Sequence, residues 1–142
     1  MRYKIIFILC CFLFISSKSF SQCKTFTKKN CLPQLQPYIF TGKYLGDVFV
    51  PGGAGEVEMT FQKGIQYKLF VCHQDVIKKV RFKVLDKDRK VIFDSMAEDV
   101  NFFEFKVNQT QDLIIQVFAL AQNNPNELVP QGCVSIVVGY KK

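Results

Sequence analysis

The residues best suited to chemistry in this chain are its cysteines and a single histidine. Beyond residue 21 the cysteines are Cys23, Cys31, Cys72 and Cys133. A zinc site would need cysteine or histidine ligands at close spacing, but none of these four has a CxxC partner, and His73 is the only histidine. An even number of cysteines in an oxidising compartment favours disulfides. We therefore predict that all four cysteines are bridged, and we expect no metal and no cofactor.

Spacing along the chain suggests how the cysteines pair. Cys23 and Cys31 enclose only a short polar segment, which favours a local Cys23–Cys31 bridge. Cys72 ends one expected strand and Cys133 begins another, so a Cys72–Cys133 bridge would tie distant parts of the core. The loop-entropy account gives a bridge over so long a loop a stabilisation of about 3 to 5 kcal/mol.

Catalysis by a cysteine–histidine pair would have to use Cys72 and His73, which are neighbours in the chain. Adjacent residues of a strand point to opposite faces, so these two side chains diverge. His73 is therefore interpreted as a histidine at a strand end on the surface. With no other candidate nucleophile or base, we predict that the protein is not an enzyme.

The acidic and glycine-rich segments fit turns between strands better than they fit binding sites. The acids that could form a cation site are Asp86, Asp88, Asp94, Glu98 and Asp99. Calcium requires six to eight closely placed oxygen ligands, whereas the DKDRK segment places basic residues between its acids. The PGGAG segment at 51–55 is not followed by GK[ST], which excludes a phosphate-binding loop. Both segments are predicted to be turns between strands.

Two short patterns match glycosylation signals. The triplet Asn108-Gln109-Thr110 matches the N-glycosylation pattern but is interpreted as a hairpin turn. The triplet Asp94-Ser95-Met96 resembles the O-glycosylation acceptor pattern of exported Bacteroidetes proteins, which makes Ser95 a candidate O-glycosylation site.

The N-terminus has the organisation of an export signal. Arg2 and Lys4 precede an apolar run from Ile5 to Ile15, which is too short to span a bilayer, and small residues follow. We predict a signal peptide over residues 1–21, cleaved before Gln22, and delivery to the periplasm, cell surface or exterior. The Ser-Gln ending resembles exported proteins of the Bacteroidetes. The alternative is a surface lipoprotein anchored through Cys23, although Gln22 stands where lipoproteins normally have a small residue.

The charge of the chain is moderate after this cleavage. Residues 1–21 carry three basic side chains and no acid, so the net charge falls from +7 to +4. The remaining lysines are spread along the chain, whereas nucleic-acid binding requires a focused basic face. We expect no nucleic-acid partner. A solvated basic surface is compatible with weak attraction to anionic glycans or lipopolysaccharide. Because the chain has no Trp, a sugar-binding platform would have to use Tyr38, Tyr44, Tyr67 or Tyr140.

Alternating apolar and polar residues predict an all-β domain. Val80, Phe82 and Val84 alternate with basic residues, and Phe103, Phe105 and Val107 alternate with Glu104 and Lys106. The expected strands are 38–50, 56–61, 65–72, 80–85, 90–94, 102–107, 112–120 and 133–140. The last two are apolar on both faces, which predicts central strands. We expect one β-sandwich over 39–142, of jelly-roll or immunoglobulin-like type with about eight antiparallel strands, after a polar, turn-rich lead-in over 22–38.

The hairpin EMTFQKGIQYKLFV, with VRFKVLDKDRKVIFDS and FFEFKVNQTQDLIIQVFA after it, resembles the pre-peptidase C-terminal domains of secreted proteases and related jelly-roll modules. The resemblance spans Tyr44 to Tyr140. It implies a secreted sandwich that serves as an accessory or binding module, and it brings no catalytic residues. Arg89 departs from the pattern, because such modules often have glycine at this turn.

These observations favour a non-catalytic exported β-sandwich that binds an envelope protein or a glycan. A structural component of an envelope assembly is the alternative. The two differ in that a binding module should present a cluster of aromatic or apolar groups at one end of the sandwich.

Overall fold

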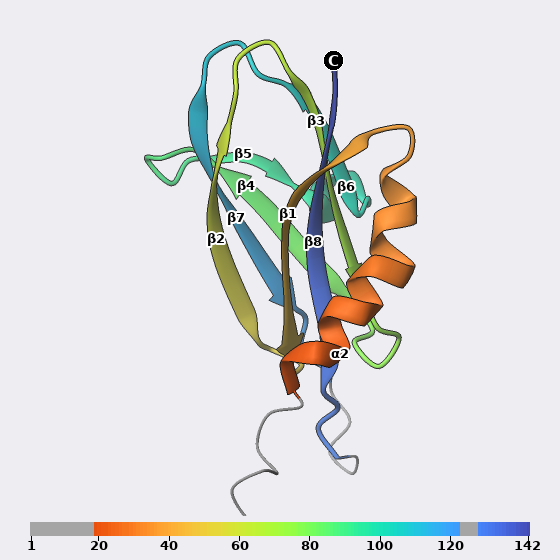
Figure 1. Ribbon diagram of the computed structural model, residues 1–142. Helices are drawn as coiled ribbons and strands as arrows, with labels where there is room; N and C mark the ends of the chain where they lie inside the picture. The colour runs from red at the N-terminus through yellow and green to blue at the C-terminus, as the bar shows by residue number, and fades with distance from the viewer. Residues whose placement is uncertain (1–18, 123–127) are drawn as a thin grey trace, which may run out of the picture.

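The computed structural model describes residues 19–122 and 128–142, and within them the chain forms two packed β-sheets (Figure 1). One four-stranded sheet has the order β1-β8-β3-β6, and the other has the order β2-β7-β4-β5. All neighbouring strands are antiparallel. This strand order is that of a jelly roll. The predicted β-sandwich is confirmed, and the jelly roll is the correct one of its two expected types.

The strands lie close to their predicted positions. They are β1 (Ile39–Phe49), β2 (Ala54–Phe61), β3 (Gln66–His73), β4 (Val80–Leu85), β5 (Val91–Asp94), β6 (Phe102–Lys106), β7 (Gln111–Ala119) and β8 (Gly132–Lys141). A short helix, α3 (Ser95–Glu98), connects β5 to β6. The two strands predicted to be central, β7 and β8, each have a partner on both sides.

The core lies between the two sheets and is built from the alternating residues. Phe82, Leu69, Ile115 and Val84 are each at most 1% exposed. Phe103 and Phe105 of the edge strand β6 stack with ring centroids 4.9 Å apart, and Phe105 also contacts Phe61 edge-on. The alternation therefore predicted the inward face of each strand correctly.

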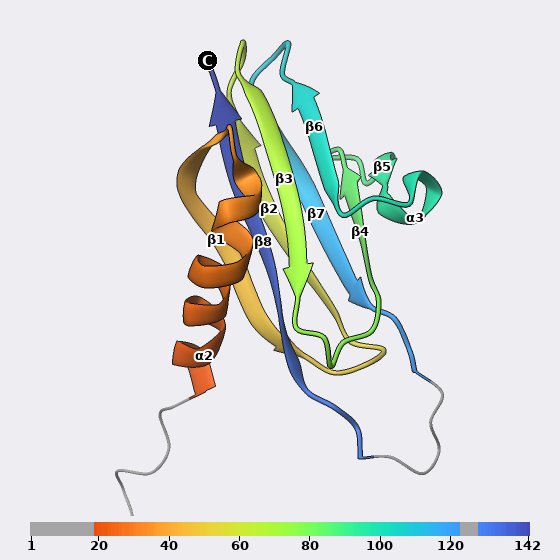
Figure 2. The same cartoon turned by 90° about the vertical axis from the view of Figure 1, so that its right-hand side faces the viewer.

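The segment before β1 is helical, so the expectation of a polar, turn-rich lead-in over 22–38 is wrong. It consists of α2 (Ser19–Phe26), the π-helix η1 (Thr27–Cys31) and the 3-10 helix η2 (Leu32–Leu35). This helical segment lies along the outer face of the sheet that contains β1, β8 and β3 (Figure 2). Every fourth residue faces the sheet: Cys23, Thr27, Cys31 and Leu35 are at most 3% exposed.

Strand β8 is apolar on both faces because the helical segment covers its outer face. The outward residues are small: Cys133, Ser135, Val137 and Gly139. Ser135 Oγ lies 2.6 Å from Thr27 Oγ1 in a buried hydrogen bond. A Cβ on Gly139 would lie 2.8 Å from Cβ of Tyr38, so glycine is needed for this close approach.

All four cysteines are paired as predicted, but the predicted partners are wrong. The bridges are Cys23–Cys133 and Cys31–Cys72, and both join the helical segment to the sheet. A Cys23–Cys31 bridge is excluded by the helix itself, because eight residues of helix separate the two Cα atoms by about 12 Å. A disulfide requires Cα atoms about 4.4 to 6.8 Å apart.

The residues of the expected signal peptide, 1–21, lie almost entirely outside the described part of the chain. Among the residues that are described, no helix is long and apolar enough to cross a membrane.

Peptide mapping without reduction will test the disulfide pairing. Lys24, Lys28 and Lys29 lie between the two N-terminal cysteines, so trypsin separates Cys23 from Cys31. We expect one linked pair that contains Cys23 with Cys133 and another that contains Cys31 with Cys72. A fragment in which Cys23 is linked to Cys31 would contradict the helical docking.

A pair of substitutions on β6 will test the assignment of its two faces. Phe105→Ala should lower the free energy of unfolding by about 3 kcal/mol, near the lower end for a buried ring because β6 is an edge strand. Glu104→Ala should cost at most about 1 kcal/mol, because its ion pair with Lys68 is partly exposed. Denaturant melts will measure both. Equal losses would show that the strand faces are assigned wrongly.

Candidate functional site

A hollow lies between the helical segment and the edge strand β6, on the outer face of the β1-β8-β3-β6 sheet. Its volume is about 530 Å³. It is lined by Phe26, Asn30, Gln34, Lys68, Phe70, Cys72, His73, Asn101 and Phe102. Apolar rings and the Cys31–Cys72 bridge are thus combined here with amide side chains and one lysine.

A second hollow of about 460 Å³ adjoins the first and shares His73, Asn101 and Phe102 with it. It adds Lys78 and Lys79 from the β3–β4 connection and residues of α3 and the loop that follows it. We call the two hollows together the trough. Its shared rim carries Phe102, whose side chain is unusually exposed for an aromatic residue, at 39%.

Lys68 contacts the Phe102 ring. Its ammonium lies 5.1 Å from the centroid of the Phe102 ring and 5.9 Å from that of Tyr38. The same ammonium lies 3.7 Å from the Glu104 carboxylate. Burial, and then the nearby Glu104 carboxylate, raise the pKa of Tyr38, which keeps its hydroxyl neutral. The exposed Phe102 ring therefore has a cation–π contact with Lys68, whose ammonium also lies near the Tyr38 ring.

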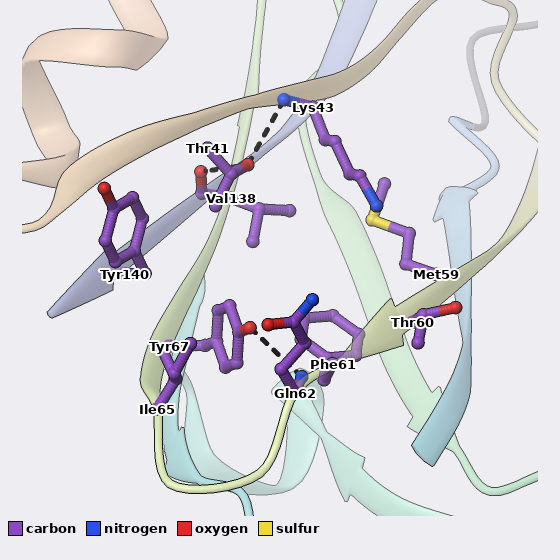
Figure 3. A pocket seen from close by; sticks show the side chains of 10 residues that line it. All are labelled: Thr41, Lys43, Met59, Thr60, Phe61, Gln62, Ile65, Tyr67, Val138 and Tyr140. Carbon is purple, nitrogen blue, oxygen red and sulfur yellow. Dashed lines mark hydrogen bonds between the residues drawn. The ribbon is translucent and has the colours of Figure 1, made fainter. Parts of the chain in front are cut away.

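A separate pocket opens between the two sheets where β2 turns into β3 (Figure 3). Its volume is about 230 Å³. Its inner wall is formed by Met59, Phe61, Tyr67 and Val138, which are all buried. Thr41 and Lys43 of β1 also line it, and the hydroxyl of Tyr67 accepts a hydrogen bond from the Gln62 backbone N–H at 3.1 Å.

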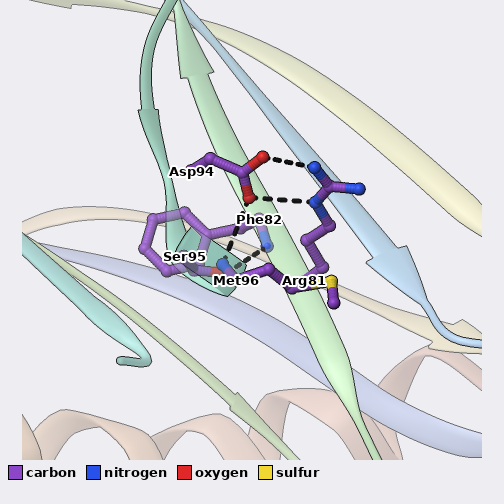
Figure 4. A network of polar contacts seen from close by, with 5 residues as sticks. All are labelled: Arg81, Phe82, Asp94, Ser95 and Met96. Carbon is purple, nitrogen blue, oxygen red and sulfur yellow. Dashed lines mark hydrogen bonds and ion pairs between the residues drawn. The ribbon is translucent and has the colours of Figure 1, made fainter. Parts of the chain in front are cut away.

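The carboxylates whose pKa values are shifted are both paired with arginines. Arg81 Nε donates to Asp94 Oδ1 at 2.9 Å, and a second contact joins the same two groups (Figure 4). Asp94 also accepts a hydrogen bond from the Met96 backbone N–H. The Arg81 hydrogen bonds lower the pKa of Asp94, although partial burial opposes them. This is the arrangement of a structural ion pair that fixes the start of α3.

Arg89 forms the second of these arginine–carboxylate pairs, which gives the arginine at this turn a structural role. Its backbone is left-handed, with φ of 63°. Its guanidinium donates to both oxygens of Glu56 on β2, at 3.1 and 2.7 Å, and Gln116 donates to the same carboxylate. These hydrogen bonds, led by those from Arg89, lower the pKa of Glu56 to about 2.

The residues singled out by the sequence lie apart from one another. His73 is half-buried on the rim of the trough, and its Nδ1 lies 3.2 Å from the Gln74 carbonyl oxygen. Asp86 accepts hydrogen bonds from the backbone N–H groups of Asp88 and Lys90, as expected for a turn. Among the described residues, no group of three acidic, histidine or cysteine side chains could hold a metal ion.

Ser95 does not fit its expected role as a glycosylation site. Its side chain is buried, at 4% exposed, and its Oγ accepts a hydrogen bond from the Phe82 backbone N–H at 2.9 Å. A modifying enzyme could not reach this hydroxyl in the folded domain. The short Asp-Ser-Met pattern is instead the start of α3, where Asp94 is the N-cap.

Comparison with known proteins shows a distant likeness to solved structures. No protein-family model matches the chain, and no curated protein matches it. Among solved structures, the chain resembles the crystal structure of Aeromonas hydrophila PliG, a periplasmic lysozyme inhibitor of g-type lysozyme. The TM-score is 0.49 and the identity 12%, over 70% of this chain and 85% of that chain.

Sequence reasoning missed the trough because both of its walls depend on unrecognised local structure. The helical wall was interpreted as a coil. The alternation places Phe103, Phe105 and Val107 inward, so Phe102, one position before Phe103, faces outward, but its role at the surface was not considered. The tyrosines considered as a sugar platform include Tyr38 and Tyr67, which are buried.

An NMR pH titration of the Glu56 carboxyl group will test the Arg89 ion pair. In the unaltered protein Glu56 should titrate near pH 2, so any stability that the pair contributes is present above pH 4.5 and is lost as the pH falls towards 2. In Arg89→Gln the pKa of Glu56 should rise towards 4.5. The matched control, Lys90→Gln at the same turn, should leave it near 2. An unchanged Glu56 titration in Arg89→Gln would contradict the pairing.

Proposed function

We propose that this protein is a non-catalytic binding module exported to the cell envelope or exterior, and that it binds a segment of an acidic glycan in the trough. The observation that carries the proposal is Phe102, an exposed ring in contact with Lys68 at the rim shared by two adjoining hollows. A single exposed aromatic residue is common on protein surfaces, but Phe102 lies where two hollows meet and next to a cation, so it offers a flat ligand a surface for stacking.

The lining of the trough suits a carbohydrate. The apolar C–H face of a sugar ring can stack on Phe102, as flat ligand rings stack on aromatic side chains. Asn30, Gln34 and Asn101 carry amide groups that both donate and accept hydrogen bonds, which matches the hydroxyl groups of a sugar. The trough consists of two adjoining hollows that are open to solvent, which favours a segment of a polymer over an enclosed small molecule.

The charges around the trough favour an acidic polymer. Lys78 and Lys79 are exposed, and neither forms an ion pair with a described residue. Asp99 is the one acidic residue that lines either hollow within the described ranges. Lys24, Lys28 and Lys29 on the neighbouring helical segment are also exposed. Carboxylate groups along a glycan would meet a positive potential here.

The two disulfides support the proposed location outside the cytoplasm, because reducing compartments do not maintain such bridges. The apolar N-terminal run supports export for an independent reason. Attachment of the chain to the envelope through a lipid on Cys23 conflicts with the structure, because Cys23 is engaged with Cys133.

Titration calorimetry with polygalacturonate and with neutral amylose will test the proposal. The disulfide-bonded protein should bind the acidic polymer more tightly, and the difference should shrink as salt is raised. Phe102→Ala should weaken binding about tenfold, equivalent to about 1.4 kcal/mol. Lys78→Gln with Lys79→Gln should weaken binding to polygalacturonate and leave any binding to amylose unchanged.

Matched controls lie on the opposite sheet. Phe118→Ala removes a half-buried ring from the outer face of β7, and Lys87→Gln with Lys90→Gln removes two exposed charges from the β4–β5 turn. None of these should alter binding. Absence of binding to both polymers would contradict the glycan and favour a protein partner. For such a partner the exposed Leu128 and Val129, at 96% and 69%, would be the first contacts to test.

A further inference from the structure

The edge strand β1 contains a bulge that positions two side chains beside the inter-sheet pocket. Between Phe40 and Tyr44 the register with β8 shifts, so that residues 41–43 stand opposite Val138 alone. Gly42 within the bulge has φ of 83°, a conformation that glycine adopts readily. Bulges of this kind redirect side chains and are frequent next to binding sites.

Side-chain hydrogen bonds hold the bulge in a defined shape. Thr41 Oγ1 donates to the Val138 carbonyl oxygen at 2.9 Å and accepts from the Lys43 backbone N–H at 3.2 Å. The threonine thereby satisfies the carbonyl group that the bulge would otherwise leave without its strand partner. Lys43 consequently reaches the pocket, and Figure 3 shows its side chain running across to Met59.

The pocket combines an apolar interior with polar groups near its opening. Phe61, Tyr67 and Val138 are buried and form its depth. Lys43 forms no ion pair with any residue in the described ranges. The Tyr67 hydroxyl accepts from the Gln62 backbone N–H, which leaves its own hydrogen available for donation.

The size of the pocket limits what it can hold. Its volume is about 230 Å³, whereas an apolar cavity of about 150 Å³ accommodates benzene. The space therefore fits an apolar body of about six to ten carbon atoms. A single cation at the opening fits one negatively charged head group on that body.

We propose that this pocket binds a medium-chain carboxylate, with its hydrocarbon body between the sheets and its carboxylate at Lys43. The shared chemistry is a short apolar chain with one anionic head group, which a free fatty acid offers as a carboxylate and an anionic lipid as a phosphate beside its acyl ester. This site is separate from the trough and does not depend on the proposed glycan.

Calorimetry with octanoate and with octanol, which lacks the charge, will test the assignment. Lys43→Gln should weaken octanoate binding about five- to tenfold and leave octanol binding unchanged. Lys63→Gln, a lysine in the β2–β3 turn that does not line the pocket, is the matched control. Ile65→Trp should fill the pocket and abolish binding of both compounds. Ile92→Trp, at an exposed position on β5, should not.

The outcomes decide the proposal in the following way. Loss of octanoate binding in Ile65→Trp, with a preserved melting transition, supports the location. Saturable binding that persists in Ile65→Trp, or the absence of octanoate binding at millimolar concentration, overturns it. Equal effects of Lys43→Gln on octanoate and octanol overturn the role of the lysine. Dioctanoyl phosphatidic acid distinguishes the two sources: binding tighter than that of octanoate indicates a lipid, and weaker binding a free acid.

Discussion

The attachment of the helical segment to the outer face of the β1-β8-β3-β6 sheet is the constraint on which the rest of the structure depends. Two disulfides and the buried Thr27–Ser135 hydrogen bond fix it. Residues of the helical segment bury the outer sides of Phe70 and Val137, which would otherwise expose apolar surface. The same attachment creates the wall of the trough. Fold stability and the proposed binding surface therefore share one set of contacts.

Alternation predicted strands such as β4 and β6, because one face of each lies in the core and the other does not. Strand β8 is buried on both faces and was predicted from its continuous apolar run. Alternation failed for the helical segment. From Cys23 to Leu35 every fourth residue is buried, and this buried stripe contains cysteine and threonine, so it does not stand out as apolar. The pairing of the cysteines failed with it, since closeness in sequence was taken for closeness in space. In a helix the two cysteines are held apart although they are close in sequence, so Cys23 pairs with Cys133 of β8 and Cys31 with Cys72 of β3.

The two candidate sites differ in how far a sequence could predict them. The inter-sheet pocket depends on the bulge at Gly42, and a lone glycine within a strand pattern does suggest a bulge. The trough depends on surfaces contributed by segments far apart in the chain, and their side chains meet only in the folded domain. No local pattern contains that information. The contact between Lys68 and Phe102 follows from strand register, which sets Phe70 opposite Phe102 and Lys68 opposite Glu104.

The connectivity of the bridges is nested: of the four bridged cysteines, the outer bridge joins the first to the last, and the inner bridge joins the two between them. For a chain that crosses a membrane N-terminus first, Cys23 emerges early, but its partner is in the final strand. The inner bridge can close once Cys72 has emerged, whereas the outer bridge must await almost the whole polypeptide. During that interval Cys31 is the nearest thiol to Cys23 in sequence. Early formation of the helical segment would keep the sulfur atoms of Cys23 and Cys31 apart, and would thereby prevent the two from forming a wrong disulfide before Cys133 emerges.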